Sequence, residues 1–172
     1  RRRRGLAAPP DAPLEPLGTD RLLAIKVRPV PGKKQQAGMP DVTLPEVTDL
    51  FLEKIYRRFR DISRHHGLVD TPVFQDEVTF YSPFPWNREI ENRLRALWGE
   101  ALPFKLAALW KPGAPGWELA RYEYRAACWN ALETNWFARV SSWCRANGLR
   151  MAGHLPGEES IFGHAQLMGD IF

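Results

Sequence analysis

The sequence predicts an α/β fold built from parallel-sheet βα units. Short apolar runs alternate with amphipathic segments of helical period along most of the chain. Two of these runs end in acid-bearing loops, as strands of parallel α/β sheets often do where a site forms. With 172 residues, 44% hydrophobic and 12% aromatic, the chain has a globular composition and enough length for one domain with its own core.

The N-terminal residues 1–20 are rich in Pro and Arg, and we expect them to form a tail or linker. Without the first four arginines, Lys+Arg falls from 24 to 20 and equals Asp+Glu, so the rest of the chain is neutral. No basic and aromatic pattern follows, so we expect a solvated end and no nucleic-acid partner. We also expect no membrane partner, because no apolar run is long enough to span one. The N-terminus has no apolar segment typical of a signal peptide, which leaves open a cleaved signal or an upstream start.

Residues 21–172 are expected to form the folded domain, beginning with a strand-like run at 22–30. A helix should follow from about residue 43 to 66, with a Thr43 and Glu46 capping box and Gly67 as its stop. Its apolar stripe is Val47, Phe51, Ile55, Phe59 and Ile62. A strand at 68–75 and a helix at 87–99 come next, the helix with Ile90, Leu94 and Leu97 facing inward.

The second half of the chain predicts one long helix between two less regular segments. Residues 102–110 are either helical or extended. The long helix runs from about Trp117 to Asn147. Aromatic residues recur along it every seven residues and form a stripe; they are Tyr122, Trp129, Trp136 and Trp143. We expect this stripe to be buried, and a ligand platform is the alternative. Cys128 and Cys144 lie about 24 Å apart along this helix, too far for a disulfide, so both should be buried thiols. A strand at 149–153 and a further helix complete the pattern.

Acidic residues follow two of the predicted strands directly. Asp76 and Glu77 come after the strand at 68–75, whereas His154, Glu158 and Glu159 come after the strand at 149–153. Because the carboxyl ends of parallel strands meet at one edge of a sheet, we expect both loops on the same side. Two carboxylates at one edge are the minimum equipment for glycoside hydrolysis, in which one protonates the leaving oxygen and the other activates water or attacks carbon.

Aromatic residues near the first acid pair suit a sugar ligand. Tyr81, Phe84 and Trp86 would offer flat faces to a sugar ring. Simpler interpretations exist for each residue taken alone: an Asp-Glu pair after a strand is often a cap or a loop charge, and a His there often only bonds the loop. His154 and Glu158 have metal-ligand spacing, but Pro156 lies between them and disfavours the helix such a site needs. We therefore name no metal ligand and no cofactor, and metal dependence is left open.

Two stretches resemble a known enzyme family. The stretch TPVFQDEVTFYSPFPWNREIENRL, residues 71–94, is similar to the segment of α-L-rhamnosidase-type glycoside hydrolases (family 106 and its relatives) in which a barrel strand ends in Asp-Glu and is followed by Pro-Trp and a helix. The stretch WCRANGLRMAGHLPGEESIFGHAQLMGD, residues 143–170, resembles a later segment of the same family, with Gly-His, an acid four residues further on and a closing Gly-Asp. The likeness extends over about residues 21–172 and is specific in these two places only.

The resemblance implies a glycosidase with a (β/α)8 (TIM) barrel and an inverting mechanism. Glu77 matches the family's general acid and Glu158 its base, with Glu159 as the substitute if the alignment shifts by one. The remaining candidates would bind the carbohydrate substrate; they are Asp76, Tyr81, Trp86 and His154. The family also implies an extracellular or periplasmic location, and it suggests rhamnose without fixing the sugar or the linkage.

The sequence departs from the family pattern in two respects. It reads Leu-Pro-Gly after His154, where an apolar run is more usual. A barrel takes about 250 residues, whereas only three or four strands can be counted in this sequence. We therefore expect part of a barrel, completed by further segments or another chain and inactive without them. The alternative is a non-catalytic, barrel-derived structural or interaction module, or an inactive fragment.

Overall fold

The computed structural model describes residues 40–80, 82 and 84–154. The predicted tail at 1–20, the strand at 22–30 and the helix expected near the end of the chain lie outside these residues. Two compact units are present. Among the described residues, unit 1 comprises Trp86–Ala127, and unit 2 comprises the residues on either side of it, 40–85 and 128–154. We describe each unit by itself.

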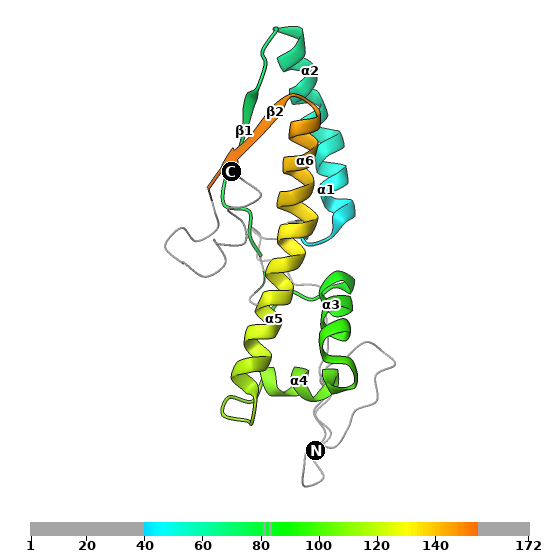
Figure 1. The fold of residues 1–172 in the computed structure, drawn as a ribbon, viewed down its shortest axis with the longest axis vertical. Helices are drawn as coiled ribbons and strands as arrows, with labels where there is room; N and C mark the ends of the chain where they lie inside the picture. Colours follow the sequence, from blue (N-terminus) through cyan, green and yellow to red (C-terminus); the bar gives the residue numbers. More distant parts are fainter. Residues whose placement is uncertain (1–39, 81, 83, 155–172) are drawn as a thin grey trace, which may run out of the picture. The chain divides into compact units, whose positions relative to one another are not determined.

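Unit 2 combines helices with a two-stranded parallel sheet (Figure 1). The first helix begins at Pro45, in the first-turn position where proline fits best, and it ends before Gly67, whose φ of 67° only glycine adopts easily. Its parts are α1 (Pro45–Phe51), a π-helical turn η1 (Leu52–Tyr56) and α2 (Arg57–His65). The later elements are the end of α5 (Trp117–Leu132), a second π-helical turn η3 (Glu133–Phe137) and α6 (Ala138–Ala146).

The predicted capping box of the first helix is wrong. Leu44 is the N-cap residue, and no side chain caps the helix. Thr43 instead bonds backwards along the chain: its backbone N–H and its hydroxyl both donate to Asp41 Oδ1, at 3.1 and 2.6 Å. This local turn replaces the capping geometry, because a single oxygen of Asp41 accepts both the backbone N–H and the hydroxyl of Thr43.

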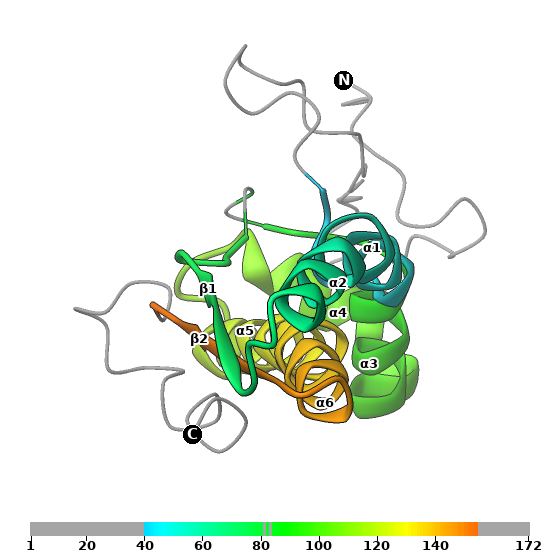
Figure 2. The ribbon, with the colours of Figure 1, turned by 90° about the horizontal axis from the view of Figure 1, so that it is seen from above.

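The strands β1 (Thr71–Gln75) and β2 (Leu149–Gly153) pair in parallel, as the sequence predicts. The register runs from Thr71 opposite Leu149 to Gln75 opposite Gly153. The helices α1, α2 and α6 all lie on one face of this sheet (Figure 2). Val73, Leu149 and Met151 are buried on that face, whereas Phe74 on the other face is 61% exposed. The described part of the chain is therefore a mixed α/β structure with a parallel sheet.

The core of unit 2 lies between the sheet and its helices. Its buried hydrophobic residues come from both strands, from both helical segments and from the chain before α1; they are Val42, Leu52, Tyr56, Val73, Leu132, Trp136, Phe137, Val140, Cys144, Leu149 and Met151. Cys128 and Cys144 are both free thiols and buried, as predicted. Within the described residues, no helix is both long and apolar enough to cross a membrane.

The π-helical turn η1 shifts the buried face of the first helix by one residue. The predicted stripe is wrong from the end of the turn onward: Ile55 is 51% exposed and Ile62 is 60% exposed, and Phe59 is exposed as well. The buried positions are instead Tyr56, the last residue of the turn, and Ser63. The reason is geometric, because a π-turn contains one residue more than an α-turn and so advances the pattern by one position.

The aromatic stripe of the long helix is buried only in part. Trp136 lies in the core of unit 2, and Trp129 and Trp143 pack against that core. Tyr122 is exposed, so the prediction is wrong for this residue. The second π-turn, η3, separates Trp129 from Trp143, so the spacing of seven residues does not keep the four rings on one line.

The described residues of unit 1 form helices that are joined by turns. Unit 1 contains α3 (Arg88–Trp98), a 3₁₀ turn η2 (Gly99–Ala101), α4 (Leu102–Leu109) and the first part of α5. Asn87 caps α3 by accepting hydrogen bonds from the N–H groups of Glu89 and Ile90. Ile90 and Leu94 are buried as predicted, but Leu97 is exposed and Trp98 takes the inward position. The Trp98 indole donates to Glu123 Oε2 at 2.7 Å, and Lys105 pairs with the same oxygen.

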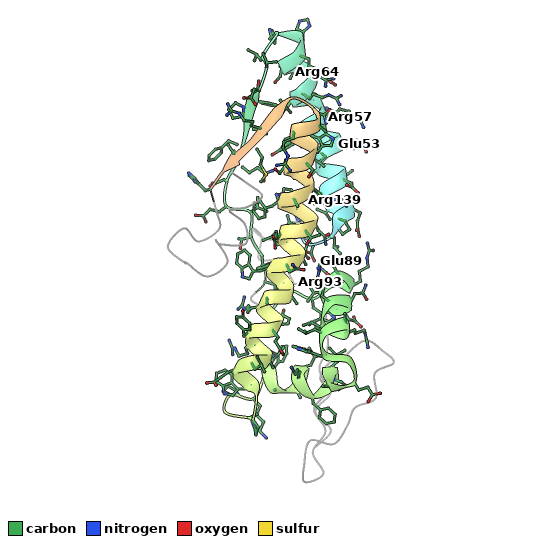
Figure 3. The ribbon with its side chains drawn as sticks, in the orientation of Figure 1. Glu53, Arg57, Arg64, Glu89, Arg93 and Arg139 are labelled. Atoms are coloured by element: carbon green, nitrogen blue, oxygen red, sulfur yellow. The ribbon has the colours of Figure 1, made fainter. Side chains whose placement is uncertain are left out.

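Two contacts join α1 to the second helical segment of unit 2, one buried and one on the surface. The Thr48 hydroxyl is buried and donates to the backbone oxygen of Asn135 at 2.6 Å, inside the η3 turn. The Asn135 side chain in turn donates to the backbone oxygen of Thr43 at 2.7 Å. On the surface, Arg139, labelled in Figure 3, donates to both carboxylate oxygens of Asp49, at 2.7 and 2.8 Å.

These neighbouring residues allow a direct comparison of buried and exposed hydrogen bonds. Thr48→Val keeps the side-chain shape but leaves the Asn135 oxygen buried without this donor, so the free energy of unfolding should fall by about 1–3 kcal/mol. Asp49→Asn breaks only an exposed ion pair and should cost less than about 1 kcal/mol. Urea unfolding of the two variants measures the difference, and an equal loss would contradict the burial argument.

Candidate functional site

The carboxyl ends of β1 and β2 bring two chain segments together that are far apart in the sequence. Because the strands are parallel and in register, Asp76 and His154 are the first residues beyond the same sheet edge. His154 Nδ1 lies 3.3 Å from Asp76 Oδ1, and the His154 N–H donates to the Gln75 oxygen at 3.0 Å. The two loops therefore begin side by side, as the sequence predicts. We call Asp76, Glu77 and His154 the strand-end cluster.

The strand-end cluster is open to solvent. The side chain of Asp76 is 82% exposed and that of His154 is 54% exposed. Asp76 Oδ1 also accepts the Glu77 N–H at 3.0 Å, so one carboxylate oxygen faces both of its neighbours. The rings of His154 and Phe74 stand nearly perpendicular to each other, with 5.0 Å between ring centroids. The cluster is thus fixed by short-range contacts but not enclosed by the described residues.

Glu77 is exposed, although it follows directly after an apolar strand. The reason is the path of the chain after β1. Val78 and Phe80 turn back to pack against the core, and the Phe80 ring lies 5.1 Å from that of Trp129. These apolar side chains take the inward positions, and Glu77 points to the side that remains in water.

The other predicted site residues are not brought to the cluster by the described structure. Glu158, Glu159 and Tyr81 lie outside the described residues. Trp86 is half-buried and begins unit 1, so the description of unit 2 does not include it. Phe84 is half-buried within unit 2. The predicted pair of Glu77 and Glu158 therefore remains a prediction.

A buried polar group directly beneath the cluster was missed by the sequence analysis. Gln75, the last residue of β1, is only 8% exposed. Its Oε1 accepts from the Trp136 indole at 2.9 Å, and its Nε2 donates to the Tyr56 hydroxyl oxygen at 2.5 Å. The strand period carries a signal for it, because Gln75 follows Val73 by two residues and so shares its inward face. We call Gln75, Tyr56 and Trp136 the amide clamp.

Gly153 makes the last pairing of the sheet possible. A Cβ atom at this position would overlap the backbone oxygen of Gln75, which lies directly opposite. Only glycine therefore allows β2 to approach β1 closely where the two loops begin. This requirement gives a physical role to the Gly-His dipeptide at the end of β2.

Burial changes the acidity of two groups in the core. Burial raises the pKa of Tyr56 to about 12, an effect that the hydrogen bond from Gln75 partly opposes. Burial also raises the pKa of the Cys144 thiol to about 11, against the nearby charge of Arg145. Both groups are neutral at physiological pH, so Tyr56 acts in the amide clamp as an uncharged hydroxyl.

The described part of the chain contains no group of side chains that could hold a metal ion. Among those residues, no three His, Cys, Asp or Glu side chains are grouped as a metal ion would require.

No protein-family model, curated protein or solved structure matches this chain. The chemistry of the site must therefore be argued from its own residues.

Gly153→Ala tests the close approach of the strands. The added methyl group must displace the end of β2 or of β1, and we expect the free energy of unfolding to fall by roughly 1–3 kcal/mol. Amide exchange of His154, whose N–H bonds to Gln75, should accelerate at the same time. Ala152→Ser, a change at the preceding residue, is the control. If Gly153→Ala leaves both the stability and the His154 exchange unchanged, the assigned role of Gly153 is wrong.

The raised pKa of Tyr56 predicts a loss of stability at alkaline pH. Its folded pKa lies above the ordinary value of 10.0, so between about pH 10 and 12 the unfolded chain releases a proton that the folded chain keeps. The free energy of unfolding should therefore fall as pH rises through this range, by on the order of 2 kcal/mol for Tyr56. Urea unfolding at several pH values measures the effect.

Matched variants isolate the Tyr56 contribution from general alkaline effects. Tyr56→Phe should flatten the pH dependence between about pH 10 and 12. Tyr122→Phe changes an exposed tyrosine in the same way and should leave the pH dependence as it is. Parallel curves for the unmodified protein and Tyr56→Phe would contradict the prediction.

Proposed function

We propose that this chain carries the carboxylate-bearing part of a glycoside hydrolase site of the α-L-rhamnosidase type. One observation supports the proposal most: the adjacent parallel strands β1 and β2 deliver both candidate loops to one sheet edge, with Asp76 3.3 Å from His154. Enzymes with parallel α/β sheets bind and convert substrates at this edge. The resemblance of the two stretches, residues 71–94 and 143–170, gives the reaction class.

In this proposal the site works by an inverting mechanism. Glu77 is the general acid that protonates the leaving oxygen, and Glu158 is the base that activates a water molecule on the opposite face of the sugar. Asp76 and His154, together with Tyr81, Trp86 and Glu159, contact the substrate. Inversion requires room for the water molecule, so the carboxyl groups of Glu77 and Glu158 should be roughly 6.5–9.5 Å apart in the assembled site.

The exposed face of the sheet agrees with a place inside a (β/α)8 barrel. In such a barrel the helices cover the outer face of the sheet, and side chains on the other face fill the interior. In unit 2 the helices cover one face, and Phe74 stands on the other, in contact with His154. Phe74 would then belong to the interior layer nearest the substrate. This arrangement supports the barrel over an isolated module, whose sheet would need a cover of its own.

Glu77→Gln tests the general-acid role. The variant should lose activity by about 10²–10⁴-fold on glycosides with poor leaving groups, because these need the proton most. Activated aryl glycosides need little protonation and should lose much less. The measurement is kcat/KM of the full-length gene product on both substrate classes.

Glu53→Gln serves as the matched control for this test. Glu53 is an exposed glutamate of η1, labelled in Figure 3, and its removal should leave both activities unchanged. An equal loss on both substrate classes with Glu77→Gln would contradict the acid role. Absence of hydrolysis across a panel of glycosides would contradict the proposed function as a whole.

A further inference from the structure

The amide clamp beneath the strand-end cluster has no part in the proposed proton transfers. Its three polar groups nevertheless meet in the core of unit 2, where Gln75 is 8% exposed and Tyr56 and Trp136 are each 3% exposed. Buried polar groups are costly unless they are fully bonded, and an apolar side chain would fill the same space without that cost. Val73 does this two residues earlier on the same face of β1.

The chemistry of the partners leaves the Gln75 amide only one orientation. An indole N–H can only donate, so the amide oxygen must face Trp136. The amide nitrogen then faces the Tyr56 hydroxyl, whose oxygen accepts. Burial keeps this hydroxyl protonated and therefore uncharged. The Gln75 side chain is thus held from two sides in one rotamer.

Both partners of Gln75 stand on π-helical turns. Tyr56 is the last residue of η1, and Trp136 lies within η3. Each turn departs from regular helix geometry, and such turns occur frequently at functional sites. The turn η1 makes position 56 an inward position, and the Thr48 hydroxyl bonds the backbone oxygen of Asn135 within η3. Two irregular turns therefore point at the same strand residue.

Gln75 is also the residue through which both loops are placed. Its backbone oxygen accepts the His154 N–H at 3.0 Å, and its own carbonyl carbon is bonded to Asp76. Asp76 in turn contacts both His154 and the Glu77 N–H. A rotation of the Gln75 peptide would therefore move His154, Asp76 and Glu77 together.

We propose that Gln75 is a positioning residue, whose amide, held by Trp136 and Tyr56, sets the direction in which β1 delivers Asp76 and Glu77 and the point at which His154 meets them. The inference rests on the proposed function for its catalytic consequence. Its structural part, the placement of the strand-end cluster, is measurable without any substrate.

Three variants each remove one polar group of the clamp and keep an apolar side chain at its position. Trp136→Phe removes the indole donor, Tyr56→Phe removes the hydroxyl, and Gln75→Met replaces the amide by an apolar chain of similar length. Val42→Ala is the control, because it shortens a buried side chain of the same core that lies outside both π-turns and both strands. Tyr56→Phe is the mildest change and keeps the test decisive where a larger change prevents folding.

Two substrate-free measurements report on the strand end. The first is the amide exchange rate of His154 relative to that of Met151 within β2; losing one clamp partner should raise this ratio by about tenfold. The second is the ring-current shift of the His154 ring protons caused by Phe74, which should diminish. Val42→Ala lowers overall stability but should leave both signals at their original values.

Kinetics of the full-length gene product give the catalytic readout. Clamp variants should lower kcat on glycosides with poor leaving groups by about tenfold or more while KM changes little, because the acid is misdirected and the substrate still binds. Val42→Ala should leave kcat unchanged at a temperature where it is folded. If the unmodified protein cleaves no glycoside, the proposed function is wrong. The two substrate-free signals then test the positioning role of Gln75 by themselves. If those signals match the Val42→Ala control in all clamp variants, the positioning role is wrong.

Discussion

The in-register pairing of β1 with β2 is the constraint on which the arrangement of the candidate site depends. The five pairs from Thr71 opposite Leu149 to Gln75 opposite Gly153 bring together segments separated by the whole of unit 1. A shift of one residue would turn the inward side chains outward and would separate the two loops. Gly153 protects this register, because its missing side chain leaves room for the Gln75 oxygen.

The helices that cover the sheet are adapted to the end of β1. Each of the two helical segments in unit 2 contains a π-turn, and each turn contributes one ring with a polar group to Gln75. The irregular backbone is supported by buried hydrogen bonds, such as the one from Thr48 to the oxygen of Asn135. The departure from regular helix geometry is therefore matched to the polar group that it serves.

Much of the fold could be predicted because local rules decide it. Gly148, with a φ of 72°, ends the long helix, and β2 follows at Leu149 as the apolar run indicates. The π-turns could not be predicted, because periodicity is judged with a constant helical repeat. The exposed positions of Ile55 and Ile62 and the buried position of Tyr56 follow from that single difference. The buried position of Gln75 was missed for another reason. A polar residue at the end of an apolar run is normally taken as the strand boundary, although Gln75 follows Val73 by two residues and so faces inward.

In the proposed glycosidase, the exposure of the strand-end cluster restricts where the rest of the catalytic site can lie. A general acid at neutral pH requires an environment that keeps water from its carboxyl group. One face of the sheet is covered by α1, α2 and α6, so the covering elements must approach from the other side, where Phe74 stands beside His154. In the positioning role proposed for Gln75, the clamp would act from the covered face of the sheet, and the substrate would enter from the open face. The end of β1 would then be held from one side, while its acidic residues stay accessible from the other.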